Sequence, residues 1–517
     1  MADPGRDQRL AVVDLGSNSF RLVVFTEHPA RQGGAGSWWR RTDEIYEPVR
    51  IGAGVDESGA LGKDGMRRAE AAIGVFAHFA DASGIAAQDV DAVATSAIRE
   101  ATNAEAFLRR VQQRTGLAIR VLSREDEARY GYLAAVNSSS LQDGLMLDLG
   151  GGSMQLVEVR GRRAERSDSW QLGAVRMTER FLPGPEPMGA KAVGRLREHV
   201  ARKLAEAPWL GEAGPHLVGV GGTVRNLGVA IQHALGVPRF GVQGFRIPRE
   251  ALGELVERLA GMTAVERGGV EGIKPARGDI ILAGALVVHA VLEHTGVDEL
   301  EVTEAGLREG VFFERHLAGR AEPLFDDVRR ESVVNLRAQY DPAPVHVDHV
   351  AHLALQLFDE LAGRGVHDGG AAERELLWAA AMLHDIGVAV DYDDHHKHSR
   401  YLVLNAGLPG YTPREVALIG QIVRYHRKGM PSPGPFAALM RKGDAAALDR
   451  CAVLLRIAEG LERGRDQVVH DTRVSLRKDG TVHLKAVADG DAPVARWAVA
   501  REVDLFQRAF DRPLVVG

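Results

Sequence analysis

Two aspartates stand at the ends of short apolar runs, and each is followed at once by a turn that contains glycine. Asp14 lies in VVDLGSNSFRLVV, and Asp148 lies 134 residues later in LMLDLGGGSMQL. An acid is unusual at the end of a strand, and a glycine-rich turn lets backbone N–H groups close around an anion. Because the pattern occurs twice, we expect two similar half-domains that face one ligand.

These aspartates and their turns predict a site for phosphate and a divalent metal ion. A turn Asp that caps its own loop explains either aspartate alone, but it does not explain the repetition. Mg²⁺ prefers one or two carboxylates, with water and phosphate oxygens completing its shell. Three amide-rich turns, at 16–19, 150–153 and 219–223, are suited to cradle a phosphate chain from both sides.

Two further charged residues lie at expected helix starts. Arg99, in TSAIREATN, follows an expected strand at 90–95. Its guanidinium fork matches phosphate oxygens, although a solvated helix Arg is the alternative. Glu127 lies in the acidic first turn of an expected helix at 124–136, where acids are favoured by the helix dipole. Residue type and position alone therefore do not single out Glu127 as a catalytic base.

A second group of chemistry-bearing residues is rich in histidine. Nine of the chain's 19 His lie between 346 and 426. A lone His at the end of an apolar helix is more often a core residue than a ligand. Here His384 and Asp385 are adjacent, and the other members of the group are His346, His395, His396, His398 and His426. This constellation favours a metal site or the remnant of one.

The elements that must position these residues alternate between strand and helix up to about residue 318. The first part predicts strands at 9–15, 20–26, 44–51, 90–95 and 118–122 and helices at 63–82, 104–114 and 124–136. The second part predicts a hairpin at 145–159, helices at 190–207 and 279–293, strands at 216–220 and 300–302, and a closing helix that starts within 304–312.

From about residue 326 to 465 the pattern is helical. The Asp479-Gly480 turn between 468–477 and 481–487 then predicts a hairpin, and a helix is expected near 499–510.

Composition is typical of a soluble globular chain of three or four domains. The 517 residues are 45% hydrophobic and 26% charged, with a formal net charge of −6. The single cysteine, Cys451, excludes a disulfide framework. The sequence lacks both an apolar run long enough for a bilayer and the h-region of a signal peptide. We expect a cytoplasmic protein with no membrane span and no nucleic-acid partner.

Seven segments, in order and at compatible spacing, resemble the exopolyphosphatase / guanosine pentaphosphate phosphatase (Ppx/GppA) family: VVDLGSNSFRL, ATSAIREATN, SREDEAR, LDLGGGS, GGT, RGDIILAGAL and EAGLREG. The resemblance implies a two-lobed α/β fold of the actin/hexokinase type, with two ribonuclease-H-like halves around a cleft. An all-α HD-like domain and a small α+β domain would follow. We divide the chain accordingly into lobe I (1–136), lobe II (137–318), the HD-like domain (319–465) and the C-terminal domain (466–517).

The resemblance also implies roles for individual residues. Glu127 matches the general base that orients the attacking water, and Asp148 matches the acid tied to Mg²⁺ and that water. Asp14 and Glu127 complete the expected ligands of Mg²⁺ (or Mn²⁺), and Arg99 joins Glu127 and Asp148 in the catalytic group. The expected phosphate-binding residues are Ser17, Asn18, Ser19, Gly151, Gly152, Ser153, Gly222 and Thr223.

Two places depart from the family pattern. The family usually continues GGGS with Thr-Glu, whereas this chain has Met154 and Gln155. An amide cannot act as a base and is a poorer Mg²⁺ ligand than a carboxylate. In the HD-like domain, Glu462 replaces the later aspartate, so the expected metal ligands there are His346, His384, Asp385 and Glu462. We expect that domain mainly to bind the polymer or a partner subunit.

The leading hypothesis is an exopolyphosphatase that processively removes terminal phosphate from inorganic polyphosphate. A basic track beyond the cleft is expected, with candidates Arg424, Arg427, Lys428, Arg441 and Lys442. Hydrolysis of guanosine pentaphosphate (pppGpp) to ppGpp is the alternative within the same fold. A non-catalytic sensor of polyphosphate or an alarmone is an alternative of another class, and a sugar or acetate kinase is a fourth. A homodimer is expected.

Overall fold

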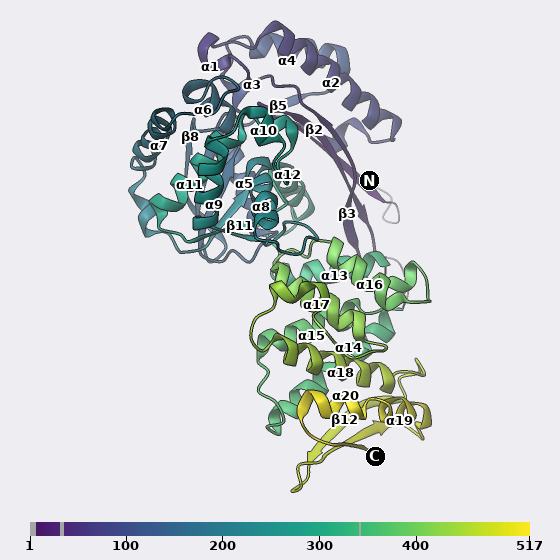
Figure 1. Cartoon of the computed structure of the whole chain (residues 1–517). Helices are drawn as coiled ribbons and strands as arrows, with labels where there is room; N and C mark the ends of the chain where they lie inside the picture. Colours follow the sequence, from purple (N-terminus) through teal and green to yellow (C-terminus); the bar gives the residue numbers. More distant parts are fainter. Residues whose placement is uncertain (1–6, 31–35, 341–342) are drawn as a thin grey trace. The chain divides into compact units, whose positions relative to one another are not determined.

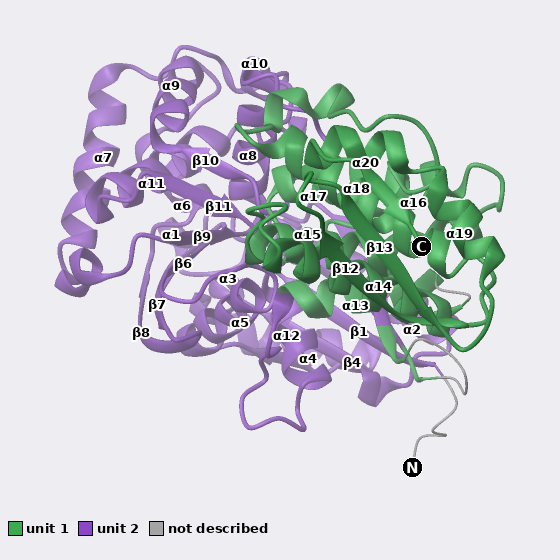
Figure 2. Cartoon of the chain, turned by 90° about the horizontal axis from the view of Figure 1, so that it is seen from below, with its two compact units in different colours: residues 1–6, 28–38, 329–517 green, residues 7–27, 39–328 purple. Residues whose placement is uncertain are grey.

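The computed structural model describes residues 7–30, 36–340 and 343–517, which form two compact units (Figure 2). The sheet unit comprises Asp7–Glu27 and Trp39–Val328. The helical unit comprises Arg329–Gly517 together with the described residues of 28–38. Within the described ranges, no helix is long and apolar enough to cross a membrane.

The first lobe of the sheet unit is a five-stranded sheet of order β3-β2-β1-β4-β5 (Figure 1). Its strands are β1 (Gln8–Leu15), β2 (Phe20–His28), β3 (Trp38–Glu47), β4 (Val90–Ala94) and β5 (Ile119–Val121). Strand β1 pairs antiparallel with β2 and parallel with β4. The helices of this part are α1 (Val55–Ser58), α2 (Lys63–Ala82), α3 (Ser96–Glu100), α4 (Ala104–Thr115) and α5 (Arg124–Val136).

The second lobe repeats this plan in a six-stranded sheet of order β10-β11-β9-β6-β7-β8. Its strands are β6 (Gly144–Leu149), β7 (Met154–Arg160), β8 (Arg163–Trp170), β9 (Leu217–Val220), β10 (Arg246–Pro248) and β11 (Glu299–Val302). Strand β6 pairs antiparallel with β7 and parallel with β9, as β1 does with β2 and β4. The predicted duplication is therefore present.

Seven helices belong to this second part: α6 (Ala174–Phe181), α7 (Ala190–Leu204), α8 (Gly222–Ala234), α9 (Arg249–Ala260), α10 (Ala264–Gly268), α11 (Ile281–Thr295) and α12 (Leu307–His316). Helix α11 is apolar on nearly every side and is buried along most of its length. A helix that is hydrophobic all round must lie inside a protein, and α11 fills the core beneath the second sheet.

One apolar core is shared by the two sheets. It joins Val12 and Val23 of the first sheet to Met146 and Val218 of the second, and Phe312 of α12 lies within it. Helices α5 and α12 cross inside this core at close range. A methyl group on Gly310 would lie 2.0 Å from the carbonyl oxygen of Tyr130. Only glycine therefore permits this close crossing.

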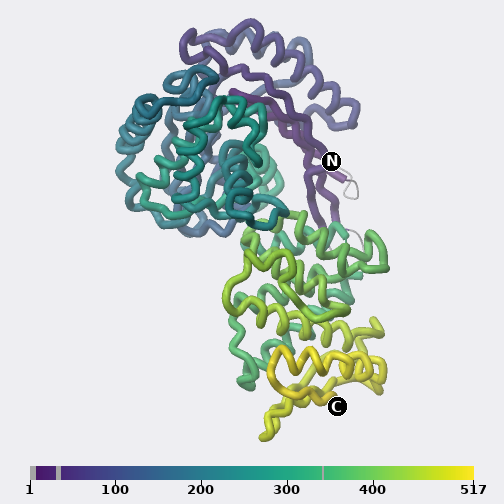
Figure 3. Tube along the Cα trace, viewed as in Figure 1, coloured from purple at the N-terminus to yellow at the C-terminus, as the bar shows by residue number. Residues whose placement is uncertain are grey.

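The helical unit contains α13 (Val328–Tyr340), α14 (Pro344–Gly363), α15 (Ala371–Leu383), α16 (His395–Asn405), α17 (Pro413–Tyr425) and α18 (Asp444–Leu461). A three-stranded sheet follows, formed by β12 (Val469–Leu476), β13 (Val482–Ala488) and β14 (Leu514–Val516). Helices α19 (Pro493–Ala500) and α20 (Val503–Phe510) pack against α18, and β12 packs against α14 (Figure 3). The terminal strands and helices thus share one unit with the helices before them.

Most expected elements are present, and those at 63–82 and 124–136 have the predicted bounds. The third strand differs, because β3 ends at Glu47 and the expected residues 49–51 leave the sheet. There Arg50 and Gly52 donate backbone hydrogen bonds to the carbonyls of Asn18 and Ser17, which supports the first glycine turn. The single helix expected at 499–510 is two helices, separated at Arg501 and Glu502. The finer four-part division of the chain stays a prediction.

Replacing Gly310 with alanine should destabilise the sheet unit, because the new methyl group has no room beside Tyr130. We expect a loss of about 1–3 kcal/mol in the free energy of unfolding, measured by urea denaturation. Gly194→Ala, on α7, is the matched control because a Cβ there meets no atom within 4 Å. Equal stability of the two variants would contradict the assigned crossing.

Candidate active site

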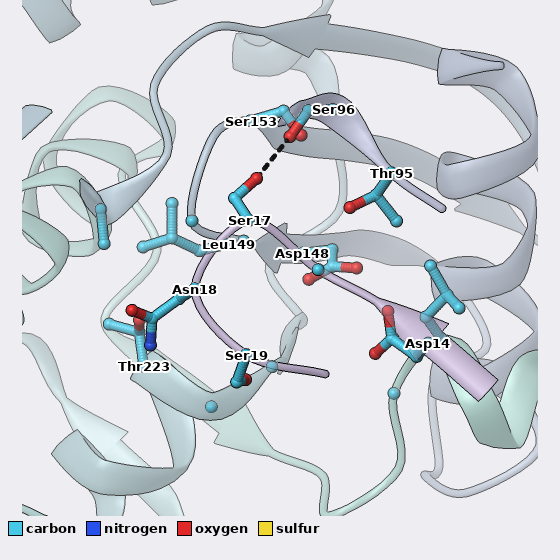
Figure 4. A pocket seen from close by; sticks show the side chains of 18 of the residues that line it. Asp14, Ser17, Asn18, Ser19, Thr95, Ser96, Asp148, Leu149, Ser153 and Thr223 are labelled. Atoms are coloured by element: carbon cyan, nitrogen blue, oxygen red, sulfur yellow. Dashed lines mark hydrogen bonds between the residues drawn. The ribbon is translucent and has the colours of Figure 1, made fainter. Parts of the chain in front are cut away.

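Two glycine turns, one from each sheet, meet at a single place. The hydroxyl oxygens of Ser17 and Ser96 lie 3.1 Å apart in the first lobe, and Figure 4 shows this hydrogen bond beside Ser153 of the second lobe. A methyl group on Gly151 would lie 3.1 Å from Ser17 Cβ, and one on Gly152 would lie 2.5 Å from Ser96 Oγ. The turns approach this closely because these positions carry no side chain.

The turns form one wall of a polar cavity that draws on both lobes. It encloses about 910 Å³, including its open mouth. The predicted residues that line it are Asp14, Ser17, Asn18, Ser19, Glu127, Asp148, Gly151, Ser153, Gly222 and Thr223. The tertiary structure therefore brings together ten predicted site residues. Two others, Gly152 and Arg99, are not among the described lining residues: Gly152 packs on Ser96, and Arg99 binds Glu127.

Asp14 and Asp148 occupy matching positions in the two hairpins. Asp14 is opposite Arg21 across β1 and β2, and Asp148 is opposite Gln155 across β6 and β7. Removal of the Asp148 carboxyl from bulk water, together with the negative charges of Glu127 and Asp14, raises its pKa to about 7. Removal from water also raises the pKa of Asp14, although Arg308 and Arg21 oppose the shift. Both carboxyls face the cavity (Figure 4) and are partly exposed to it.

The cap of α5 does not involve Glu127. Ser123 and Asp126 form the reciprocal capping box of α5, so Glu127 is not needed there. Its buried side chain instead lines the cavity, and Gly131, one turn further along α5, leaves room for the carboxylate of Asp148.

Three side chains hold the Glu127 carboxylate. Ser153 Oγ donates to Oε2 at 3.3 Å, Gln155 Nε2 donates to the same oxygen at 3.1 Å, and Arg99 donates to Oε1. Arg99 is itself fixed by a 2.8 Å hydrogen bond to the carbonyl of Leu122. Burial raises the pKa of Glu127 and outweighs the opposing effect of Arg99. A buried carboxylate with a raised pKa is suited to accept a proton near neutral pH.

Four arginines that sequence reasoning did not select also line the cavity: Arg21, Arg225, Arg277 and Arg308. Gly222 accommodates one of them, because a methyl group there would lie 2.3 Å from Arg277 Nη2. Burial and the neighbouring Arg308 lower the pKa of Arg225 to about 10, which indicates that positive charge is concentrated at this wall. Arg21 had a usable signal, since its place opposite Asp14 follows from the hairpin register.

Most of the predicted histidine group comes together within the helical unit, whereas His396 and His398 belong to neither of the two groups described next. His346, His384 and Asp385 lie close enough for one metal ion, and Asp385 forms a second such group with His395 and His426. Glu462 lies at the side of the first group, with an oxygen 3.9 Å from His346 Nδ1. The carboxylate that faces His346 Nε2 is Glu459, at 3.1 Å.

Sequence comparisons identify the family of this chain. A sequence model of the Ppx/GppA phosphatase family matches residues 42–318, and one of domain III of that family matches residues 328–490. The chain belongs to the Ppx/GppA phosphatase family. The predicted resemblance is thereby confirmed, and membership makes the chain a phosphoanhydride hydrolase.

Curated relatives of this family member cover almost its whole length. It is 28% identical over 481 residues to the guanosine-5'-triphosphate,3'-diphosphate pyrophosphatase of Vibrio cholerae, across 91% of this chain and 92% of that protein. The same-named protein of Vibrio vulnificus is 28% identical over 484 residues, across 93% and 92% of the two chains.

Solved structures of the family match about three-fifths of the chain. A family member from Aquifex aeolicus is 28% identical with a TM-score of 0.51, across 61% of this chain and all of that one. An exopolyphosphatase-like protein is 27% identical with a TM-score of 0.53, across 60% and 99%. An exopolyphosphatase from Cytophaga hutchinsonii, 20% identical with a TM-score of 0.53 across 62% and 100%, shares the fold. The actin-like arrangement of two sheet lobes is thus shown.

The raised pKa of Asp148 predicts a pH-dependent stability in the presence of a chelator. The Asp148 carboxyl keeps its proton up to about pH 7 in the folded protein but releases it near pH 3.8 in the unfolded chain. Ionisation of Asp148 therefore lowers the free energy of unfolding as the pH rises from about 4 to 7. Asp148→Asn cannot ionise. Its melting temperature minus that of the wild type should therefore rise by several degrees between pH 4 and pH 8.

Calorimetry on both proteins checks this expectation, and Asp64→Asn, an exposed aspartate in the first turn of α2, is the surface control. A difference that stays constant across this pH range would contradict the charge environment assigned to Asp148.

Proposed function

We propose that this protein is an exopolyphosphatase, which removes terminal phosphate from inorganic polyphosphate one residue after another. The observation that carries the proposal is the lining of the cavity. Four arginines and three amide-rich turns face a group of carboxylates, and none of the described lining residues is aromatic. Such a lining suits a chain of phosphates, which offers anionic oxygens at every unit and no ring to stack.

Mg²⁺ (or Mn²⁺) is the proposed cofactor. Asp14 and Asp148 fit this ion. Removal from water and the repulsion between the two groups disfavour their charged forms. A nearby cation would therefore stabilise these charged forms strongly. Glu127 is the third carboxylate at the cavity. When bound, the ion would neutralise charge on the phosphate oxygens and make a nearby water more acidic.

In the proposed reaction Glu127 accepts a proton from the water that attacks the terminal phosphorus in line. Arg99, Ser153 and Gln155 hold its carboxylate in place, so we assign Arg99 to positioning the base rather than to clamping phosphate. The turn amides and the cavity arginines stabilise the charge that spreads over the transferring phosphoryl oxygens. The shortened polyphosphate leaves, and orthophosphate is released.

Hydrolysis of pppGpp is the second candidate. It is favoured by the two Vibrio relatives, which are named guanosine-5'-triphosphate,3'-diphosphate pyrophosphatases and match this chain over more than nine-tenths of its length. A 5'-triphosphate ends in the same terminal anhydride as polyphosphate, so its phosphates would use the same turns and arginines. A comparison of kcat/KM for the two substrates decides between the candidates.

Glu127→Gln should abolish turnover while keeping the fold, because an amide retains the shape of the side chain but cannot accept the proton. We expect a loss of about 10²–10⁴-fold in kcat, measured as orthophosphate released from long-chain polyphosphate with Mg²⁺. Glu125→Gln is the matched control, since Glu125 is exposed in the same first turn of α5. Full activity of Glu127→Gln would refute the proposed base. Turnover of pppGpp but not of polyphosphate by the wild type would favour the second candidate.

Gln155→Glu should shift the pH profile. The amide now donates to Glu127 Oε2 at 3.1 Å, and a carboxylate would replace that donor with a second negative charge. We expect the acidic limb of log(kcat/KM) to move to higher pH by about one unit or more and kcat/KM at pH 7 to fall about tenfold.

Gln232→Glu is the control for introducing an acid at a buried glutamine, since Gln232 is equally enclosed and donates to the carbonyl of Gly241. An unmoved acidic limb in Gln155→Glu would show that the amide does not set the charge state of Glu127.

A further inference from the structure

A buried cluster of six metal-ligating side chains lies among the helices of the helical unit. His346 lies on α14, and His384 and His426 follow the last residues of α15 and α17. Asp385 follows His384, His395 begins α16, and Glu459 lies on α18. His384 is fully buried, and the other three histidines and Asp385 are at most 5% exposed. None of them belongs to the cavity of the sheet unit.

Asp385 lies at the centre of this cluster and is shared by two groups. The ligand atoms of His346, His384 and Asp385 all lie within 4.8 Å of one another, and so do those of Asp385, His395 and His426. Asp385 Oδ1 is 3.2 Å from His395 Nε2 and 3.7 Å from His384 Nε2. Asp385 Oδ2 is 3.9 Å from His346 Nε2. One carboxylate therefore stands between two sets of imidazoles.

Three of these histidines are held with the same nitrogen facing inward. The Nδ1 atoms of His384, His395 and His426 each hydrogen-bond the carbonyl three residues earlier, at 2.7, 2.9 and 2.7 Å. A carbonyl only accepts, so each Nδ1 is the donor, and the neutral ring then presents the lone pair of Nε2 to the cluster. Fixing of the outer ring nitrogen by a backbone carbonyl is the usual support of a metal-ligating histidine.

Two of the inward-facing nitrogens have no hydrogen-bond partner, and two others face each other. His384 Nε2 and His346 Nε2 are buried without a hydrogen bond, although Glu459 Oε2 lies 3.5 and 3.1 Å from them. His395 Nε2 and His426 Nε2 face each other at 3.1 Å. Two lone pairs at that distance repel, whereas two imidazoles bound to one ion at about 2.0–2.1 Å each stand roughly 3–3.4 Å apart. Buried polar atoms in this state are normally satisfied by an ordered water or an ion, and converging lone pairs favour an ion.

We propose that the helical unit binds two divalent transition-metal ions that share Asp385 as a bridging ligand. The first ion takes His346, His384, Asp385 and Glu459. The second takes Asp385, His395 and His426, with water or an anionic oxygen completing its shell. Imidazole with carboxylate selects Mn²⁺, Fe²⁺, Co²⁺ or Zn²⁺ over Mg²⁺ and Ca²⁺, so excess Mg²⁺ competes poorly for this centre but well for the carboxylates of the sheet unit.

Arginines at the cluster define its surroundings. Arg465 Nη2 donates to Asp385 Oδ2 at 2.9 Å, and its side chain is 46% exposed. Arg427 Nη1 lies 3.4 Å from His395 Nδ1. Arg465 orients the bridging carboxylate, and the two guanidinium groups favour an anion, with phosphate as the matching class, at the remaining positions of the ions.

The metal content of the full-length chain tests the proposal. Protein stripped with a chelator is dialysed against Mn²⁺ or Zn²⁺ in the presence of excess Mg²⁺. The Mg²⁺ occupies sites that are formed by carboxylates alone. Bound metal is then measured by mass spectrometry. We expect two ions per wild-type chain, one in His395→Gln or His426→Gln, and fewer than one in Asp385→Asn. His398→Gln, on the same helix α16 but outside both groups, is the control and should keep two.

Electron paramagnetic resonance of the Mn²⁺-loaded protein gives a readout that needs no variant to fold. A bridged pair should show the exchange-coupled signal of two ions, and His426→Gln should convert it to the signal of a single ion. Fewer than two ions in the wild type, an uncoupled signal there, or equal metal content in Asp385→Asn overturns the proposal. Orthophosphate release from polyphosphate with Mg²⁺ is measured separately, so failure here is distinguishable from failure of the proposed function.

Discussion

The arrangement of the cavity depends on one constraint: two carboxyls, one from each sheet, lie in the same cavity. Asp14 and Asp148 repel each other, and each loses hydration, so their charged forms are disfavoured together. The remainder of the cavity is arranged to offset this cost. Arginines and amide-rich turns line the rest of the cavity and supply positive potential there. This balance of charges supports the proposed Mg²⁺ and phosphate ligands.

The shared core explains how the two lobes present one site. Helices α5 and α12 approach so closely that Gly310 has no space for a methyl group beside Tyr130. This crossing carries Glu127 on one helix and Arg308 on the other to the same cavity. The capping box of Ser123 and Asp126 then leaves the Glu127 side chain available for chemistry. The position of Glu127, the proposed base, thus depends on packing remote from the cavity as well as on its immediate hydrogen bonds.

The two units hold different kinds of ligand sets. The sheet unit offers carboxylates and backbone amides, which suit Mg²⁺ and phosphate, whereas the helical unit offers four imidazoles with Asp385 and Glu459. Gln155 also has a defined place in the first set: its amide donates to Glu127, where a carboxylate would repel it. Departure from the family pattern at this position therefore bears on the proposed base, and not only on the proposed metal site.

The sequence by itself determined the repeated hairpins, the helices at 63–82 and 124–136, and ten of the residues that line the cavity. All but one of these follow from local patterns: strand alternation, helical spacing, and glycine turns beside an aspartate. Glu127 is the exception, because only the resemblance to the family pointed to it. Only the tertiary structure decided that Arg21, Arg225, Arg277 and Arg308 converge, that Arg99 holds Glu127, and that Glu459 faces the histidines. Such contacts join residues far apart in the chain, and their direction is set by how helices and sheets pack, which local patterns do not encode.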